Sequence, residues 1–155
     1  MQLTRAADYG VRVMVHLAAA PPGKRLLLPE LAQAAEAPVS FLSKVLQALT
    51  RAGLIGSRRG QAGGFAISPH GLRANLREVI EAVDGPIRLN VCLSPGRSCG
   101  RKQWCPAHPV WARAQRAMFE VLESVTIAGL ADQAASSRSH VFEIGLRGAA
   151  AEGAI

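Results

Sequence analysis

Residues 39–68 read VSFLSKVLQALTRAGLIGSRRGQAGGFAIS, and this stretch decides the fold. In its first part, 39–52, apolar residues recur at the three- and four-residue spacing of one helix face. These residues are Leu42, Val45, Leu46 and Leu49. Gly53 follows where a helix C-terminus favours a left-handed residue. We therefore expect a helix over 39–52, with one buried face and one polar face.

Two short strand-like runs, 54–57 and 65–68, surround the Gly-rich segment 58–64. This pattern predicts a β-hairpin with two arginines at its tip. Upstream, a short helical pattern over 29–36 ends before Pro38. Two helices separated by a tight break and followed by a hairpin describe a winged helix-turn-helix. The expected fold class is mainly α with a small β-hairpin wing.

Three longer helices and a short last one that starts at Thr126 are also predicted outside this stretch. The first covers 4–19 and is capped by Thr4, the second covers 73–83, and a long one covers 107–125. The expected domains are a winged helix-turn-helix at 1–85, a cysteine-bearing loop at 86–106, a long and a short helix at 107–131, and a flexible tail at 132–155.

The charge distribution favours a nucleic-acid partner. The chain has 155 residues and a formal net charge of +7, which favours an anionic partner in general. Between residues 37 and 77 there is no Asp or Glu, although the window overlaps the second helix and the wing. Its basic residues are Lys44, Arg51, Arg58, Arg59, Arg73 and Arg77. A solvated surface would intersperse both signs, so we expect double-stranded DNA as the partner.

The helix at 39–52 would enter the major groove of DNA. Four polar side chains would then lie near base edges, namely Ser40, Ser43, Lys44 and Gln47. Arg51 is expected to bind phosphate, and Arg58 and Arg59 to reach the minor groove or the phosphates beside it.

The chain shows no signal peptide and no apolar run of the roughly 18 residues that a membrane span requires. We therefore expect a cytoplasmic protein with neither a membrane partner nor a small-molecule substrate. Disulfides are rare in that compartment. A group of three cysteines there indicates metal or redox chemistry.

Cys92, Cys99 and Cys105 have the spacing C-x6-C-x5-C. Thiolates suit iron–sulfur clusters, zinc or copper(I). Structural zinc sites usually contain closer cysteine pairs, so the long Gly-containing gaps favour a larger iron–sulfur cluster and leave zinc as the alternative. Unligated thiols are a further alternative. A thiol enzyme is disfavoured, because nothing marks an activating base or an oxyanion site.

Three thiolates leave one ligand position to be filled. His108 lies three residues beyond Cys105 and is the nearby candidate. Asp8 is a remote candidate that could come from the other protomer of a dimer. Spacing alone favours an ion pair of Asp8 with Arg5 or Arg12.

Several segments together resemble the IscR/NsrR-like (Rrf-two) family of bacterial winged helix-turn-helix, iron–sulfur transcriptional regulators. They are MQLTRAADYGVRVMVHLA, VSFLSKVLQALTRAGL, SRRGQAGGF, LREVIEAVDGP and the three cysteines. The resemblance extends in order over residues 1–131. It implies a homodimer held by the long helix at 107–125, with a cluster in the cysteine loop that sets the affinity for DNA.

The resemblance also implies roles for single residues. Ser40 and Arg59 match DNA-contacting positions, while Ser43 stands where some members carry glutamate. His108 matches the ligand of the 2Fe–2S members, and Asp8 matches that of the 4Fe–4S, nitric-oxide-sensing members. The first gap between cysteines is one residue longer here than in common members. Proximity favours His108 and hence a 2Fe–2S cluster.

The sequence thus predicts a DNA-binding transcriptional repressor and not an enzyme. Its affinity for an operator would respond to iron–sulfur status, redox state or nitric oxide. The alternative is a winged-helix module with a structural zinc site and no sensing role.

Overall fold

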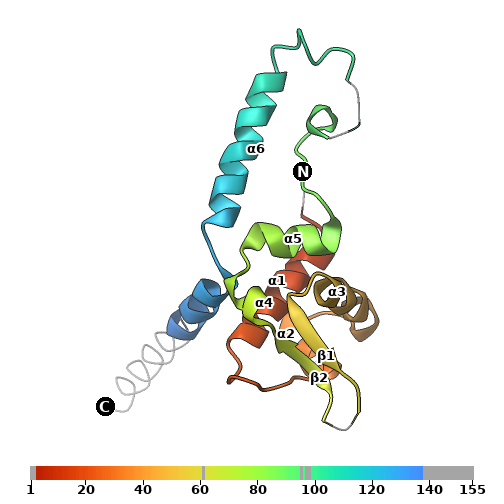
Figure 1. Ribbon diagram of the computed structural model, residues 1–155, viewed down its shortest axis with the longest axis vertical. Helices are drawn as coiled ribbons and strands as arrows, with labels where there is room; N and C mark the ends of the chain where they lie inside the picture. The colour runs from red at the N-terminus through yellow and green to blue at the C-terminus, as the bar shows by residue number, and fades with distance from the viewer. Residues whose placement is uncertain (1–2, 61, 95, 97–98, 138–155) are drawn as a thin grey trace, which may run out of the picture.

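The computed structural model describes residues 3–60, 62–94, 96 and 99–137. Helices and one hairpin form a body, and a long helix projects from it (Figure 1). The elements are α1 (Arg5–Ala18), α2 (Leu28–Ala35), α3 (Val39–Arg51), β1 (Ile55–Arg58), β2 (Gly64–Ile67), α4 (Pro69–Arg73), α5 (Leu76–Asp84), the 3-10 turn η1 (Val91–Leu93) and α6 (His108–Glu123). Residues 127–137 are also helical, and most of the tail predicted at 132–155 lies outside the described residues.

Helix α1 lies at the centre of the body, where α2, α3 and α5 all pack against it. Thr4 caps α1, as predicted, because its side chain accepts a hydrogen bond from the Ala7 amide. Gly10 faces α5 so closely that a Cβ at this position would lie 3.1 Å from Val83. The absence of a side chain at Gly10 therefore lets α1 and α5 approach each other.

The predicted helix-turn-helix is confirmed by α2 and α3. The four predicted core residues of α3 are all buried, and they are Leu42, Val45, Leu46 and Leu49. Gly53 has φ of +71°, the left-handed conformation expected after the helix. The structure places α2 one residue earlier than the predicted range 29–36.

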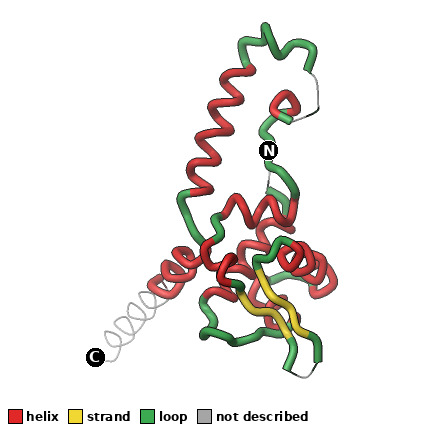
Figure 2. Tube along the Cα trace, viewed as in Figure 1, coloured by secondary structure: helices red, strands yellow, loops and turns green. Residues whose placement is uncertain are grey.

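The wing is confirmed as an antiparallel pair, in which β1 runs beside β2 from the Ile55–Ile67 pair to the Arg58–Gly64 pair. Figure 2 shows this hairpin projecting from the helical body. The backbone of Leu26 exchanges two hydrogen bonds of 2.9 Å with Phe65, which anchors the wing to the chain before α2. Both strands are shifted by one residue from the predicted ranges.

The prediction of one helix over 73–83 is wrong at its start. The chain forms α4, passes through an extended residue at Asn75, and then forms α5. Asn75 and Glu78 exchange side-chain and backbone hydrogen bonds of 2.9 Å, a capping box that fixes the start of α5 at Leu76. Ser68 caps α4 in a similar way through the Gly71 amide.

Helix α6 presents two apolar sides. Met118, Phe119 and Leu122 pack against a small cluster in the body. On another side, Val110 and Val121 are 59% and 67% exposed. Among the described helices, none has a long enough apolar run to cross a bilayer.

We predict that Gly71→Ala destabilises the fold, because the added Cβ would lie 2.0 Å from the carbonyl oxygen of Leu54. The backbone must then shift, and overpacking of this kind costs about 1–3 kcal/mol. Urea unfolding of the two proteins measures the difference. Gly56→Ala is the matched control, because nothing lies within 4 Å of its added Cβ. Equal stability of the Gly71 and Gly56 variants would contradict this account of the packing.

Candidate functional site

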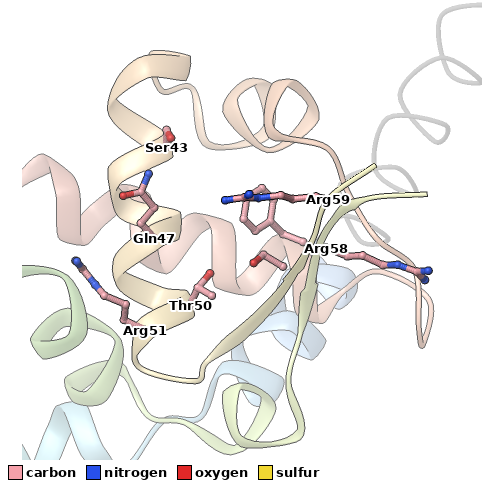
Figure 3. A pocket seen from close by; sticks show the side chains of 8 residues that line it. Ser43, Gln47, Thr50, Arg51, Arg58 and Arg59 are labelled. Atoms are coloured by element: carbon pink, nitrogen blue, oxygen red, sulfur yellow. The ribbon is translucent and has the colours of Figure 1, made fainter. Parts of the chain in front are cut away.

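A groove of about 470 Å³ lies between α3 and the wing. Its α3 side presents residues three or four positions apart, and its wing side comes from β1, the hairpin tip and β2 (Figure 3). The lining residues are Ser43, Gln47, Thr50, Arg51, Ser57, Arg58, Arg59 and Phe65. The groove is open to solvent and carries three guanidinium groups, a surface that suits a polyanion.

Five of the seven residues predicted to contact DNA line this groove, namely Ser43, Gln47, Arg51, Arg58 and Arg59. Ser40 and Lys44 are exposed on α3 but do not belong to the lining. The two wing arginines diverge, because Arg59 extends toward α3 and Arg58 points away from it (Figure 3).

Sequence reasoning missed Thr50, Ser57 and Phe65 as part of the groove. Thr50 lies three residues after Gln47, so its place on this side of α3 could have been found from helical spacing. Its hydroxyl donates a 2.8 Å hydrogen bond to the Leu46 carbonyl of the same helix. Ser57 and Phe65 are paired across the hairpin, and only the strand register reveals this.

Arg77 is the last basic residue of the acid-free window, the segment 37–77 that has no Asp or Glu, and it does not line the groove. Its guanidinium lies 2.6 Å from Glu123 of α6 and 3.3 Å from Glu81 of α5. The hydrogen bond with Glu123 is the main reason that the pKa of Arg77 is raised. The window therefore supplies fewer basic residues to this groove than the sequence count indicated.

The second candidate site is a cavity of about 390 Å³ in the cysteine loop. The three cysteines and His108 all line it, together with Asn90, Val91, Lys102 and Trp111. Cys92 comes from η1, Cys105 precedes α6 and His108 is the first residue of α6. The loop lies at the end of α6 that is farthest from the body (Figure 1).

Two of the four candidate ligands are in contact. Nδ1 of His108 lies 3.4 Å from Sγ of Cys92, although 16 positions separate the residues. The thiols of Cys99 and Cys105 are half-buried around the same cavity. Turns hold these residues, since the Lys102 amide donates to the Cys99 carbonyl and the His108 amide donates to the Cys105 carbonyl.

Three sulfur donors and one imidazole around a single cavity are a donor set that fits an iron–sulfur cluster. A cluster spreads its ligands over several metal atoms, so they need not converge on one point. In the described part of the chain, no three His, Cys, Asp or Glu side chains lie close enough together to hold a single metal ion.

Asp8, the alternative fourth ligand, lies on α1 and does not line the cysteine cavity. Its carboxylate forms an ion pair of 2.9 Å with Arg12, one turn along the helix. The hydrogen bond that Arg12 donates to Asp8 raises the pKa of Arg12. The ion pair expected from spacing is thus confirmed, with Arg12 as the partner.

Comparisons with known proteins agree with this fold. A family model described as "Rrf2: Iron-dependent Transcriptional regulator" matches residues 3–133. Protein aau3 of Rhizobium meliloti is 33% identical over 132 residues, which cover 84% of each chain. Among solved structures, CymR of B. subtilis, named the global cysteine regulator of that organism, is 25% identical with a TM-score of 0.66, over 86% of this chain and 98% of CymR.

The fold of T. potens IscR is similar as well, with 22% identity and a TM-score of 0.67, over 86% of this chain and 88% of IscR. The predicted resemblance and the winged helix-turn-helix fold are therefore confirmed. The family consists of transcriptional regulators, which also confirms the expectation that the chain is not an enzyme. With 131 of its residues matched by the family model, the chain belongs to the Rrf2 family of transcriptional regulators.

Proposed function

We propose that this regulator is a dimeric repressor whose affinity for an operator is controlled by an iron–sulfur cluster. The observation that supports the proposal is the gathering of Cys92, Cys99, Cys105 and His108 around one cavity. These four side chains would hold the cluster. His108 is favoured as the fourth ligand because it already contacts Cys92, whereas Asp8 is paired with Arg12.

DNA binding would use the groove between α3 and the wing. Helix α3 fits the major groove of DNA, about 12 Å wide, with Ser40, Ser43 and Gln47 toward the base edges. Lys44 would contribute to the same surface, since it is exposed on α3. The divergence of the wing arginines supports separate roles, in which Arg59 reaches toward the bases and Arg58 toward the phosphates of the flanking minor groove.

Dimerisation would use the exposed side of α6. Val110, Ala114, Ala117 and Val121 recur at helical spacing, and all four are exposed in the single chain. A helix face of this kind buries apolar surface when it packs against its own copy. A dimer would present its two α3 helices to successive major grooves on one side of the DNA, which are one helical turn or about 34–36 Å apart.

The cysteine loop is tied to the proposed dimer helix by its own residues. The Leu89 amide donates a 3.1 Å hydrogen bond to the Gln115 side chain of α6, and His108 begins α6. A bound cluster would supply a centre that responds to oxidants, iron supply or nitric oxide. Cys92 lies near the start of the loop and His108 is the first residue of α6. Ligation of one cluster by both residues would therefore tie the loop to α6 and restrain this helix.

The direct test is anaerobic purification followed by iron, sulfide and absorption measurements. We predict iron and acid-labile sulfide together with visible absorption in the wild type, and an altered spectrum in His108→Ala because one ligand is lost. Asp8→Ala is the matched comparison and should keep the wild-type spectrum. An unchanged spectrum for His108→Ala would contradict this ligand, and a colourless protein with stoichiometric zinc would favour the structural-zinc alternative.

Arg59→Ala is predicted to weaken binding to a duplex selected from a random pool by about 1–3 kcal/mol, the range for loss of one base-reading arginine. Fluorescence anisotropy measures the change. Arg116→Ala is the control, because Arg116 lies on α6 and does not line the groove. If the Arg59 variant bound as tightly as the control, Arg59 would not belong to the DNA-binding site.

A Val121→Glu substitution is predicted to turn the dimer into a monomer at micromolar concentration. A carboxylate would be buried in the apolar interface without a partner, which costs several kcal/mol. Sedimentation equilibrium measures the mass. Glu120→Gln is the control, since it lies beside the proposed face without belonging to it. Retention of the dimer by the Val121 variant would exclude this side of α6 as the interface.

A further inference from the structure

Arg77 connects the body of the molecule to α6 through a single guanidinium group. Nη1 lies 2.6 Å from Oε1 of Glu123, and Nε lies 3.3 Å from Oε2 of Glu81. The same group lies over the ring of Phe119, with 3.7 Å between Cζ and the ring centroid. Two of these three partners, Phe119 and Glu123, belong to α6, and the Arg77 side chain is only 28% exposed.

The other contacts at this junction are of two kinds. Backbone hydrogen bonds join Ile127 to Ala74 and Leu76 to Val125, and they hold the chain just beyond α6 against the body. Met118 and Leu122 pack on apolar residues of α1 and α5. Packing of helix side chains favours a class of crossing angles with a scatter of about 15–20°, so it does not by itself fix one angle of α6.

An arginine is suited to fix such an angle. Its guanidinium is planar and rigid, and its donors lie in a fixed fork that also stacks on an aromatic ring. Here Nη1 donates a hydrogen bond to Glu123 of α6, and the face of the group lies on Phe119. Nε faces Glu81 of α5 as an ion pair without a hydrogen bond. A tilt of α6 would break at least one of these contacts.

We propose that Arg77 is a positioning residue that sets the angle between α6 and the DNA-binding body. In a dimer held through α6, this angle determines the distance between the two α3 helices. Arg77 would thereby set which spacing of operator half-sites the dimer prefers. The inference rests on the proposed function, because it requires a dimer that binds two half-sites.

The geometry gives a small tilt a large effect. Helix α6 has 16 residues. At about 1.5 Å per residue it is about 24 Å long, so a tilt of about 10° moves its far end by about 4 Å. Successive base pairs of DNA are about 3.4 Å apart along the helix axis. When α6 is held in the dimer, the same tilt would instead rotate the body and shift α3, so a loosened junction would tolerate half-sites one base pair closer or farther apart.

The competing interpretation is that Arg77 binds a DNA phosphate, as its place in the acid-free window first indicated. The two roles differ in two measurable quantities. Loss of a phosphate contact weakens binding to every duplex. It also reduces the steepness of the plot of log K for binding against log salt concentration, the salt slope, by about one unit. Loss of a positioning contact changes the preferred spacing and leaves the salt slope unchanged.

The test uses Arg77→Met, which keeps an unbranched side chain over Phe119 but removes the charge and the fork. Arg116→Met is the matched control on an exposed position of α6. Glu123→Gln is a second variant that weakens the same contact from the other side. Affinity is measured at several salt concentrations on duplexes derived from a selected palindrome, with half-sites moved by one base pair in either direction.

We expect the wild type and Arg116→Met to lose about tenfold in affinity for each base pair of displacement, because the two α3 helices are held at one spacing. Arg77→Met and Glu123→Gln should lose less than about threefold, with a salt slope equal to that of the wild type.

An unchanged spacing preference in both Arg77→Met and Glu123→Gln would overturn the proposal. A uniform loss across all spacings with a lower salt slope would overturn it as well, in favour of a phosphate contact. If the wild type bound no duplex, the proposed function itself would fail, a result distinguishable from failure of the positioning role alone.

Discussion

The apolar face of α3 is buried against α1, and the surface proposed to bind DNA depends on this contact. Leu42, Val45, Leu46 and Leu49 lie in the same core as Val13, Met14 and Leu17 of α1. Each such side chain contributes about 1.5–3 kcal/mol when it is buried. Because one side of α3 is fixed in this way, the other side must face solvent, and it carries Ser43, Gln47 and Arg51 toward the wing. The same packing thus stabilises the body and orients the groove.

The two candidate sites lie at opposite ends of the molecule. The basic groove is at the end formed by α3 and the wing, and the cysteine cavity is at the distal end of α6 (Figure 1). Two routes connect them within one chain, namely α6 with its junction to α5, and the segment 85–90 that leads from α5 to η1. The Arg77 contacts lie at the junction of α6 with α5, and they are more directional than the surrounding packing. The proposed sensing role and the proposed positioning role therefore depend on the same helix.

Much of the fold could be predicted from the sequence, because local signals agreed with the packing. Thr4, Gly53 and the spacing of Leu42 to Leu49 each act within a few residues, and the structure confirms all of them. The start of α5 was mispredicted because the apolar pattern over 73–83 hid the capping box of Asn75 and Glu78. A capping box sets where a helix begins even where the hydrophobic period extends upstream of it.

The site was less predictable, because it depends on tertiary contacts. The basic window correctly indicated Arg51, Arg58 and Arg59 at the groove, but it could not show that Arg77 turns toward Glu123, which lies 46 positions away. Spacing grouped the three cysteines, yet only the folded loop brings Cys92 against His108. Charge patterns and motif spacing describe neighbours along the chain, whereas these pairs form between distant segments.

The central claim is that the cysteine cavity controls the affinity of the DNA-binding face. Its most direct test measures the dissociation constant for one selected duplex on a single anaerobic preparation, before and after iron is removed by a chelator, at fixed salt concentration. We predict a change of about tenfold or more, the size of a typical coupling between two sites. Equal affinities in the two states would contradict the claim.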